Sequence, residues 1–150
     1  MAEPSTPEPG IRQTRVFEAP RERVWREWTD PEAFADWFGG PDFEIPLESV
    51  SMDVRAGGTW RLTMLIGRNE THWTGEYVEV DAPARLVFTV TDRPEHPERD
   101  LVTVLLTDLG DGRTEMHFEQ SGHMTAEEYR RAGQGWGVFF DRMDARLAGG

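Results

Sequence analysis

The sequence predicts an α+β fold. In it a curved antiparallel sheet of about six to seven strands wraps around one long C-terminal helix, and two short helices follow the first strand. Three observations predict this arrangement. Apolar residues recur at every second position over much of residues 43–122, which is typical of strands. Residues 126–147 carry an apolar stripe with helical spacing. Because a sheet with one apolar face needs a cover, we expect this helix to lie on the sheet.

The N-terminal part predicts one strand and two short helices. Residues 11–18 alternate loosely between apolar and polar side chains and indicate a strand, and residues 21–28 have helical spacing. The second helix begins at Thr29, which has capping-box spacing to the glutamate three residues later, or at Asp30 as an alternative cap. Gly39-Gly40-Pro41 ends it.

The middle of the chain predicts consecutive strands joined by short turns, and such strands are antiparallel. Asp111-Gly112 is a strong hairpin signal, and residues 93–100, with two prolines and five charges, indicate a solvated loop. We expect strands at residues 43–54 (one or two strands), 59–66, 71–80, 86–90, 101–106 and 114–120.

The last helix is predicted from about residue 126 to 147. Thr125 and Glu128 have capping-box spacing, and the apolar stripe consists of Trp136, Phe140, Met143 and Leu147. Glycines at 133, 135 and 137 interrupt it, and each costs about 1 kcal/mol relative to alanine in a helix. Either a close approach of the helix to the sheet or open volume beside it would offset that cost.

The composition excludes several classes of protein. The chain has 150 residues and a net charge of -12, all 16 basic residues are arginine, and there is no cysteine. Disulfides, thiolate zinc sites and thiol nucleophiles are therefore excluded. We expect no nucleic-acid partner, because phosphate contacts need clustered basic residues. Residues 1–10 are expected to be a disordered tail before a single domain at 11–148. With neither a secretory signal nor an apolar membrane span, we expect a cytoplasmic protein without membrane insertion.

Several segments together resemble the activator of heat-shock-protein-90 ATPase homologue family, within the START-like (SRPBCC, helix-grip) superfamily. The resemblance covers about residues 11–148. The segments that carry it are Ala19-Pro20 before Val24-Trp25, Trp28-Thr29-Asp30-Pro31-Glu32, Trp37-Phe38, Asp53-Val54-Arg55, Gly57-Gly58-Thr59-Trp60, Gly75-Glu76-Tyr77-Val78-Glu79-Val80, Leu86-Val87-Phe88-Thr89 and Gly135-Trp136.

The resemblance implies a helix-grip domain that often binds a hydrophobic small molecule. Members include co-chaperone domains and ligand-sequestering resistance proteins, and related branches include polyketide cyclases and lipid-transfer domains. The co-chaperone's separate N-terminal domain, which carries its chaperone contacts, has no counterpart in these 150 residues. We therefore rank a co-chaperone role below ligand binding.

The aromatic residues are the strongest functional lead, because this many large rings exceed what a core of this size needs. Trp25 and Trp28 are expected to be core anchors. We predict a cavity between sheet and last helix, with His72 or Arg61 orienting an aromatic or polycyclic ligand. The predicted cavity residues are Trp37, Phe43, Trp60, Met64, His72, Trp73, Phe88, Phe118, Trp136, Phe139, Phe140 and Met143.

Catalysis and metal binding have weaker support. The four histidines show no HExxH spacing, no serine lies in a GxSxG elbow, and no cofactor or metal is predicted. A cyclase or dehydratase is the second hypothesis, and it needs His72, His117 or Glu119 to face the cavity as an acid or base. A co-chaperone role would require a large exposed apolar patch. An exposed edge strand would permit a homodimer.

Overall fold

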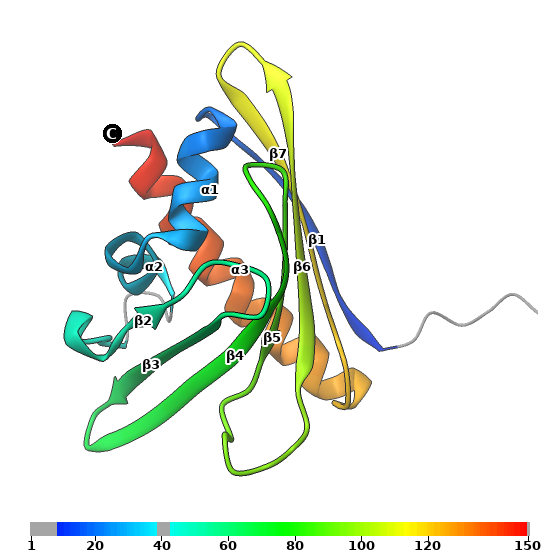
Figure 1. Cartoon of the computed structure of the whole chain (residues 1–150). Coiled ribbons are helices and arrows are strands. Elements are labelled where there is room, and N and C mark those ends of the chain that lie inside the picture. Colours follow the sequence, from blue (N-terminus) through cyan, green and yellow to red (C-terminus); the bar gives the residue numbers. More distant parts are fainter. Residues whose placement is uncertain (1–8, 39–42, 150) are drawn as a thin grey trace, which may run out of the picture.

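The computed structural model describes residues 9–38 and 43–149, in which a seven-stranded antiparallel sheet curves around helices on one side (Figure 1). The strand order is β1-β7-β6-β5-β4-β3-β2. The predicted fold class is confirmed. The elements are β1 (Gly10–Phe17), α1 (Arg21–Thr29), α2 (Pro31–Trp37), the 3-10 turn η2 (Leu47–Ser49), β2 (Ser51–Met52), β3 (Thr59–Ile66), β4 (Asn69–Asp81), β5 (Arg85–Val90), β6 (Asp100–Gly110), β7 (Arg113–Ser121) and α3 (Ala126–Ala148).

Alternation along the strands places one set of side chains on the concave side of the sheet, as the period of two predicts. The buried residues on this side include Trp60, Leu62 and Met64 of β3, Leu86, Phe88 and Val90 of β5, Val102, Val104 and Leu106 of β6, and Met116, Phe118 and Gln120 of β7. The hairpin between β6 and β7 turns at Asp111-Gly112, where both residues have the positive φ that this turn requires.

Helix α3 begins with the predicted capping box. The Glu128 backbone N–H donates to Thr125 Oγ1 over 3.1 Å, and the Thr125 backbone N–H donates to Glu128 Oε1 over 2.9 Å. The predicted stripe is buried, with Tyr129 added at its start. Helix α3 crosses the concave face of the sheet, and α1 and α2 lie on the same side (Figure 1). Both the predicted cap and the predicted apolar stripe of this helix are therefore confirmed.

The glycines of α3 have two different surroundings. A Cβ on Gly133 would touch β1 side chains at ordinary distances, whereas a Cβ on Gly135 or Gly137 would have open space around it. The carbonyls of Gly133 and Gly137 accept hydrogen bonds from Gln13 Nε2 at 2.7 Å and Arg15 Nη2 at 3.1 Å. A close approach of the helix to the sheet therefore does not explain Gly135 and Gly137.

Two local predictions need correction. Thr29 is the last residue of α1, and Asp30 caps α2 by accepting the Glu32 backbone N–H at 2.9 Å. Residues 43–54 are mostly not strand. Pro46 has no N–H to donate to a neighbouring strand, and it precedes the turn η2. Only two residues, Ser51–Met52, form β2. Before η2, Glu44 forms one isolated bridge with Leu65. The Gly39-Gly40-Pro41 stop lies outside the described residues.

Candidate functional site

Aromatic rings fill the space between the sheet and α3, and they meet at Trp28 of α1. The Trp28 ring lies 4.8–6.4 Å, centroid to centroid, from six other rings. Those partners are Phe34 and Trp37 of α2, Phe88 of β5, Phe118 of β7, and Trp136 and Phe140 of α3. These separations are typical of aromatic pairs in contact. We call these seven residues the aromatic cluster.

Three tryptophans around this space are held by hydrogen bonds from their indole N–H groups. The bonds run from Trp37 Nε1 to the Glu27 carbonyl at 2.7 Å, from Trp60 Nε1 to the Thr89 carbonyl at 3.0 Å, and from Trp136 Nε1 to Gln120 Oε1 at 2.8 Å. A buried indole with a satisfied N–H has a defined orientation. Three of the rings are therefore fixed by the protein itself.

The Trp60 hydrogen bond depends on the absence of a side chain at the opposite position of the neighbouring strand. Trp60 lies opposite Gly75 of β4, and its indole reaches across Gly75 to the carbonyl of Thr89 on β5. A Cβ at position 75 would lie 1.7 Å from that carbonyl oxygen and 2.6 Å from Trp60 Nε1. Glycine is therefore required here for close approach rather than for a special backbone angle.

A buried polar network ties Trp136 to the surface. Gln120, which accepts from Trp136, donates through Nε2 to Asp100 Oδ2 at 2.9 Å. Asp100 is 3% exposed, and its Oδ1 lies 2.9 Å from His123 Nδ1. Burial, with Asp100 adding to it, raises the pKa of the adjacent Tyr129 to about 12. The network holds one carboxylate inside the fold with its partners, as a buried charge requires.

Other buried donors have no partner among the described residues. They include the indole N–H groups of Trp28 and Trp73 and the hydroxyl of Tyr77. Burial, with a smaller contribution from Asp53, raises the pKa of Tyr77, so this hydroxyl keeps its proton. Buried polar groups nearly always have partners, so unpaired donors at these positions point to an acceptor supplied from elsewhere.

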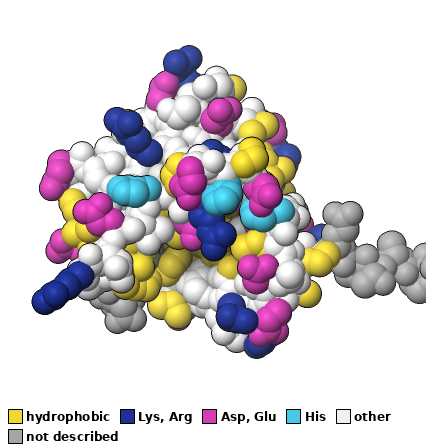
Figure 2. Space-filling view, turned by 90° about the horizontal axis from the view of Figure 1, so that it is seen from below, with side chains coloured by type: hydrophobic (Ala, Val, Ile, Leu, Met, Phe, Trp, Pro, Cys, Tyr) yellow, Lys and Arg dark blue, Asp and Glu magenta, His cyan; other side chains and the backbone are white. Residues whose placement is uncertain are grey.

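A second group of rings leads from the aromatic cluster toward the surface. Phe38 lies 5.6 Å from Trp136 and also contacts Trp73 at 5.3 Å and Phe139 at 5.5 Å, centroid to centroid. Trp73, Phe139 and Phe43 are only partly buried. Viewed from below, histidine, arginine and acidic side chains lie near the middle of the face, and hydrophobic side chains lie in separate places around them (Figure 2).

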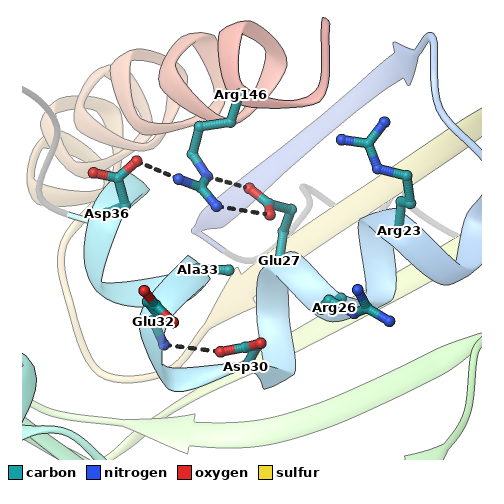
Figure 3. Close-up of a pocket in the computed structure, with 8 residues that line it drawn as sticks. All are labelled: Arg23, Arg26, Glu27, Asp30, Glu32, Ala33, Asp36 and Arg146. Atoms are coloured by element: carbon teal, nitrogen blue, oxygen red, sulfur yellow. Dashed lines mark hydrogen bonds and ion pairs between the residues drawn. The ribbon is translucent and has the colours of Figure 1, made fainter. Parts of the chain in front are cut away.

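Two surface hollows lie away from the aromatic cluster. One, of about 480 Å³, is lined by residues of β3, β4 and η2 together with Pro94, and these residues include Arg61, His72 and Trp73. The other, of about 570 Å³, lies between α1, α2 and the end of α3 (Figure 3). There Arg146 Nε donates to Glu27 Oε1 at 2.7 Å and also pairs with Asp36, which accepts from Arg142 at 3.2 Å.

These ion pairs join the two short helices to α3. Burial raises the pKa of Asp36, but the hydrogen bonds from Arg146 and Arg142 outweigh it and hold the net pKa below the usual value. The buried carboxylate of Glu27 has its charge matched by Arg146. We therefore interpret this hollow as a structural contact that fixes α1 and α2 on α3.

The structure brings together most of the predicted site residues, and it adds Trp28. Trp28 is buried in the core, as expected of a core anchor, and it is also the centre of the aromatic cluster. Eight of the predicted site residues lie in the buried core: Trp37, Trp60, Met64, Phe88, Phe118, Trp136, Phe140 and Met143. Three more are partly buried and pack against that core: Phe43, Trp73 and Phe139.

His72 does not join them. It is adjacent to Trp73 on β4, and because neighbouring strand residues point to opposite faces, only one of the two can face inward. His72 lies on the outer face, with Nδ1 3.2 Å from Thr63 Oγ1, and Arg61 lies on that same outer face. The expectation that either residue orients a ligand in the interior was wrong.

The other acid–base candidates also lie on the outer face. His117 and Glu119 alternate with the buried Met116 and Phe118 of β7. A hydrogen bond between them, 3.1 Å from Nε2 to Oε1, is the main reason that the pKa of Glu119 is lowered. None of the three residues that the cyclase hypothesis requires faces the interior.

Comparison with known proteins gives the family. The family model described as "Activator of Hsp90 ATPase homolog 1-like protein" matches residues 18–148. The chain belongs to this family. The resemblance seen in the sequence is thereby confirmed. No curated protein sequence matches the chain.

Solved structures of similar fold come from several organisms. A Chromobacterium violaceum protein is 27% identical, covers 92% of this chain and 96% of its own, and superposes with a TM-score of 0.82. A Nitrosomonas europaea protein is 24% identical, with coverages of 96% and 97% and a TM-score of 0.79. The AHSA1 protein of Silicibacter pomeroyi is 20% identical, with coverages of 93% and 97% and a TM-score of 0.81. Within residues 9–38 and 43–149, no helix is long and apolar enough to cross a bilayer.

Proposed function

We propose that this member of the Activator of Hsp90 ATPase homolog 1-like family binds a hydrophobic small molecule, aromatic or polycyclic, between the sheet and α3. The observation that carries the proposal is the convergence of rings from α2, β5, β7 and α3 on Trp28 of α1. A flat apolar ligand would replace ring–ring contacts with ligand–ring contacts. Each Å² of apolar ligand surface removed from water contributes about 25 cal/mol.

The path of entry follows the partly buried rings. Trp73 and Phe139 flank Phe38, which in turn contacts Trp136 of the aromatic cluster. Because the rings of the described residues already contact one another here, a ligand would enter by displacing rings. Gly135 and Gly137, with open space beside them, lie on the helix that carries Trp136 and Phe139.

The alternatives have less support. A cyclase would need an acid or base in the interior, and His72, His117 and Glu119 lie on the outer faces of β4 and β7. A co-chaperone surface would need a contiguous apolar patch. The large hydrophobic residues that are exposed come from different elements, for example Val16 of β1, Val78 of β4 and Val138 of α3.

A fluorescence titration tests the proposal. Intrinsic tryptophan emission is recorded while rigid polycyclic compounds such as pyrene and fluorene are added. We expect saturable quenching or a spectral shift, because Trp28 and its neighbours would contact the compound. If the folded protein shows no saturable change with any aromatic compound in the panel, the proposal is wrong.

A pair of variants locates the binding path. Phe139→Ala removes a ring that flanks Phe38, whereas Val138→Ala alters the neighbouring residue, which is 49% exposed. We expect Phe139→Ala to change the affinity or the rate of binding and Val138→Ala to leave both unchanged. Equal effects of the two substitutions would contradict the proposed path.

A further inference from the structure

Two hydrogen-bond donors lie unpaired beside the same ring. The indole N–H of Trp28 and the hydroxyl of Tyr77 have no partner among the described residues, and their side chains are 1% and 3% exposed. Both rings flank Phe88, with centroids 6.1 Å and 6.3 Å from it. Trp37, Trp60 and Trp136, in contrast, each donate to a protein acceptor within 3.0 Å. Among the described aromatic residues, buried unpaired donors therefore occur at Trp28, Tyr77 and Trp73, and the first two lie beside Phe88.

We propose that the ligand is a neutral apolar compound that carries an oxygen acceptor, such as a ring carbonyl or ether, rather than a plain hydrocarbon or a cation. This inference rests on the proposed function. An acceptor that reaches Trp28 Nε1 or Tyr77 Oη would satisfy a buried donor that the protein leaves unpaired. A cation brings further donors and no acceptor, and an anion would have to leave water and enter a protein of net charge -12.

The hydroxyl of Tyr77 is available as a donor at any ordinary pH. Burial raises its pKa, so it does not ionise and cannot act as an anionic acceptor instead. Replacing Tyr77 with phenylalanine removes this donor and changes the ring in no other way. The unliganded Tyr77→Phe protein should be at least as stable as the parent, because the deleted hydroxyl has no partner to lose.

A matched pair of probes tests the ligand class. Fluorene and 9-fluorenone share one rigid tricyclic frame, and only the ketone carries an acceptor. Equilibrium dialysis should show 9-fluorenone binding about 3- to 10-fold more tightly, the range that a net hydrogen bond supports. Tyr77→Phe should reduce that preference and leave the affinity for fluorene unchanged. Tyr129→Phe is the matched control, because the Tyr129 hydroxyl already accepts the Met124 backbone N–H at 3.3 Å.

A second measurement reports on Trp28, whose substitution can prevent folding. In a ¹⁵N–¹H spectrum of the indole groups, the Trp28 resonance should move downfield with 9-fluorenone and less with fluorene. The bonded indoles of Trp37, Trp60 and Trp136 provide internal references.

The outcomes separate the two proposals. A ketone preference that falls in Tyr77→Phe, or that comes with the Trp28 shift, supports the inference. Binding of both probes with equal affinity overturns it and leaves the proposed function standing, and this is the result expected if internal water already satisfies the donors. Binding of neither probe overturns the inference, whereas the proposed function is overturned only if no aromatic compound of the fluorescence panel binds.

Discussion

Replacing Gly75 by alanine should destabilise the protein severely, because this position lets two strands and an indole meet. The added Cβ would lie 1.7 Å from the Thr89 carbonyl oxygen, where real Cβ contacts stay beyond 3.0 Å. The strands must therefore separate locally by about 1.3 Å or more, and overpacking of this kind costs about 1–3 kcal/mol. Trp60 also loses its bond to Thr89, and an unpaired buried N–H costs about 1–3 kcal/mol.

The combined loss is about 2–6 kcal/mol in the free energy of unfolding. For a chain of this length it corresponds to a fall in Tm of about 4–24 °C. Urea unfolding followed by far-UV circular dichroism measures the loss, with Gly135→Ala as the matched control. An added Cβ at position 135 has open space, so that substitution should stabilise α3 by about 0.5–1 kcal/mol. If Gly75→Ala costs less than about 1 kcal/mol, the close-approach interpretation is wrong.

Two further predictions concern the polar contacts. Gln120→Met should cost about 2–4 kcal/mol in unfolding free energy, because Trp136 and a buried carboxylate both lose a partner, whereas the exposed Gln134→Met should be neutral in urea unfolding. Equal urea-unfolding midpoints for Gln120→Met and Gln134→Met would contradict a stabilising role of the polar network. The lowered pKa of Asp36 contributes stability that is present above its ordinary pKa, near 3.8, and that is lost as pH falls through the lowered value. Asp36→Asn should therefore flatten the acid limb of a stability-against-pH curve, while Asp144→Asn, on the exposed side of α3, should leave it unchanged.

The sequence predicts the fold well because its periods are unambiguous. The alternation Trp60, Leu62, Met64 specifies an inward face for β3, and the Thr125–Glu128 box specifies where α3 begins. The alternation of side chains along a strand also shows where the site prediction fails. His72 and Trp73 are neighbours on a strand, so naming both as cavity residues contradicts the pattern that predicted the strand.

Other features depend on contacts between distant segments, which no local pattern contains. Gln120 occupies one of the inward-facing positions of β7. A polar residue at such a position indicates that it has a buried hydrogen-bond partner. Its partner, Asp100, lies 20 residues earlier at the end of a charged loop, and only the pairing of β6 with β7 brings the two together. Trp28 likewise becomes the centre of the site only when α1 is placed on the sheet.

The filled interior also restricts what kind of ligand can bind. Every aromatic pair that a ligand separates costs about 0.5–1.5 kcal/mol beyond the area exposed, and the population of the binding-competent open state falls about tenfold for each 1.4 kcal/mol of that cost. A flexible chain would lose its own conformational entropy in addition and could not restore ring–ring geometry around Trp28. A rigid planar compound restores offset-stacked and edge-to-face contacts with Phe118 and Trp37, which already pack against Trp28 in those two geometries. Under the proposed function, a preference for rigid aromatic ligands would therefore follow from this packing.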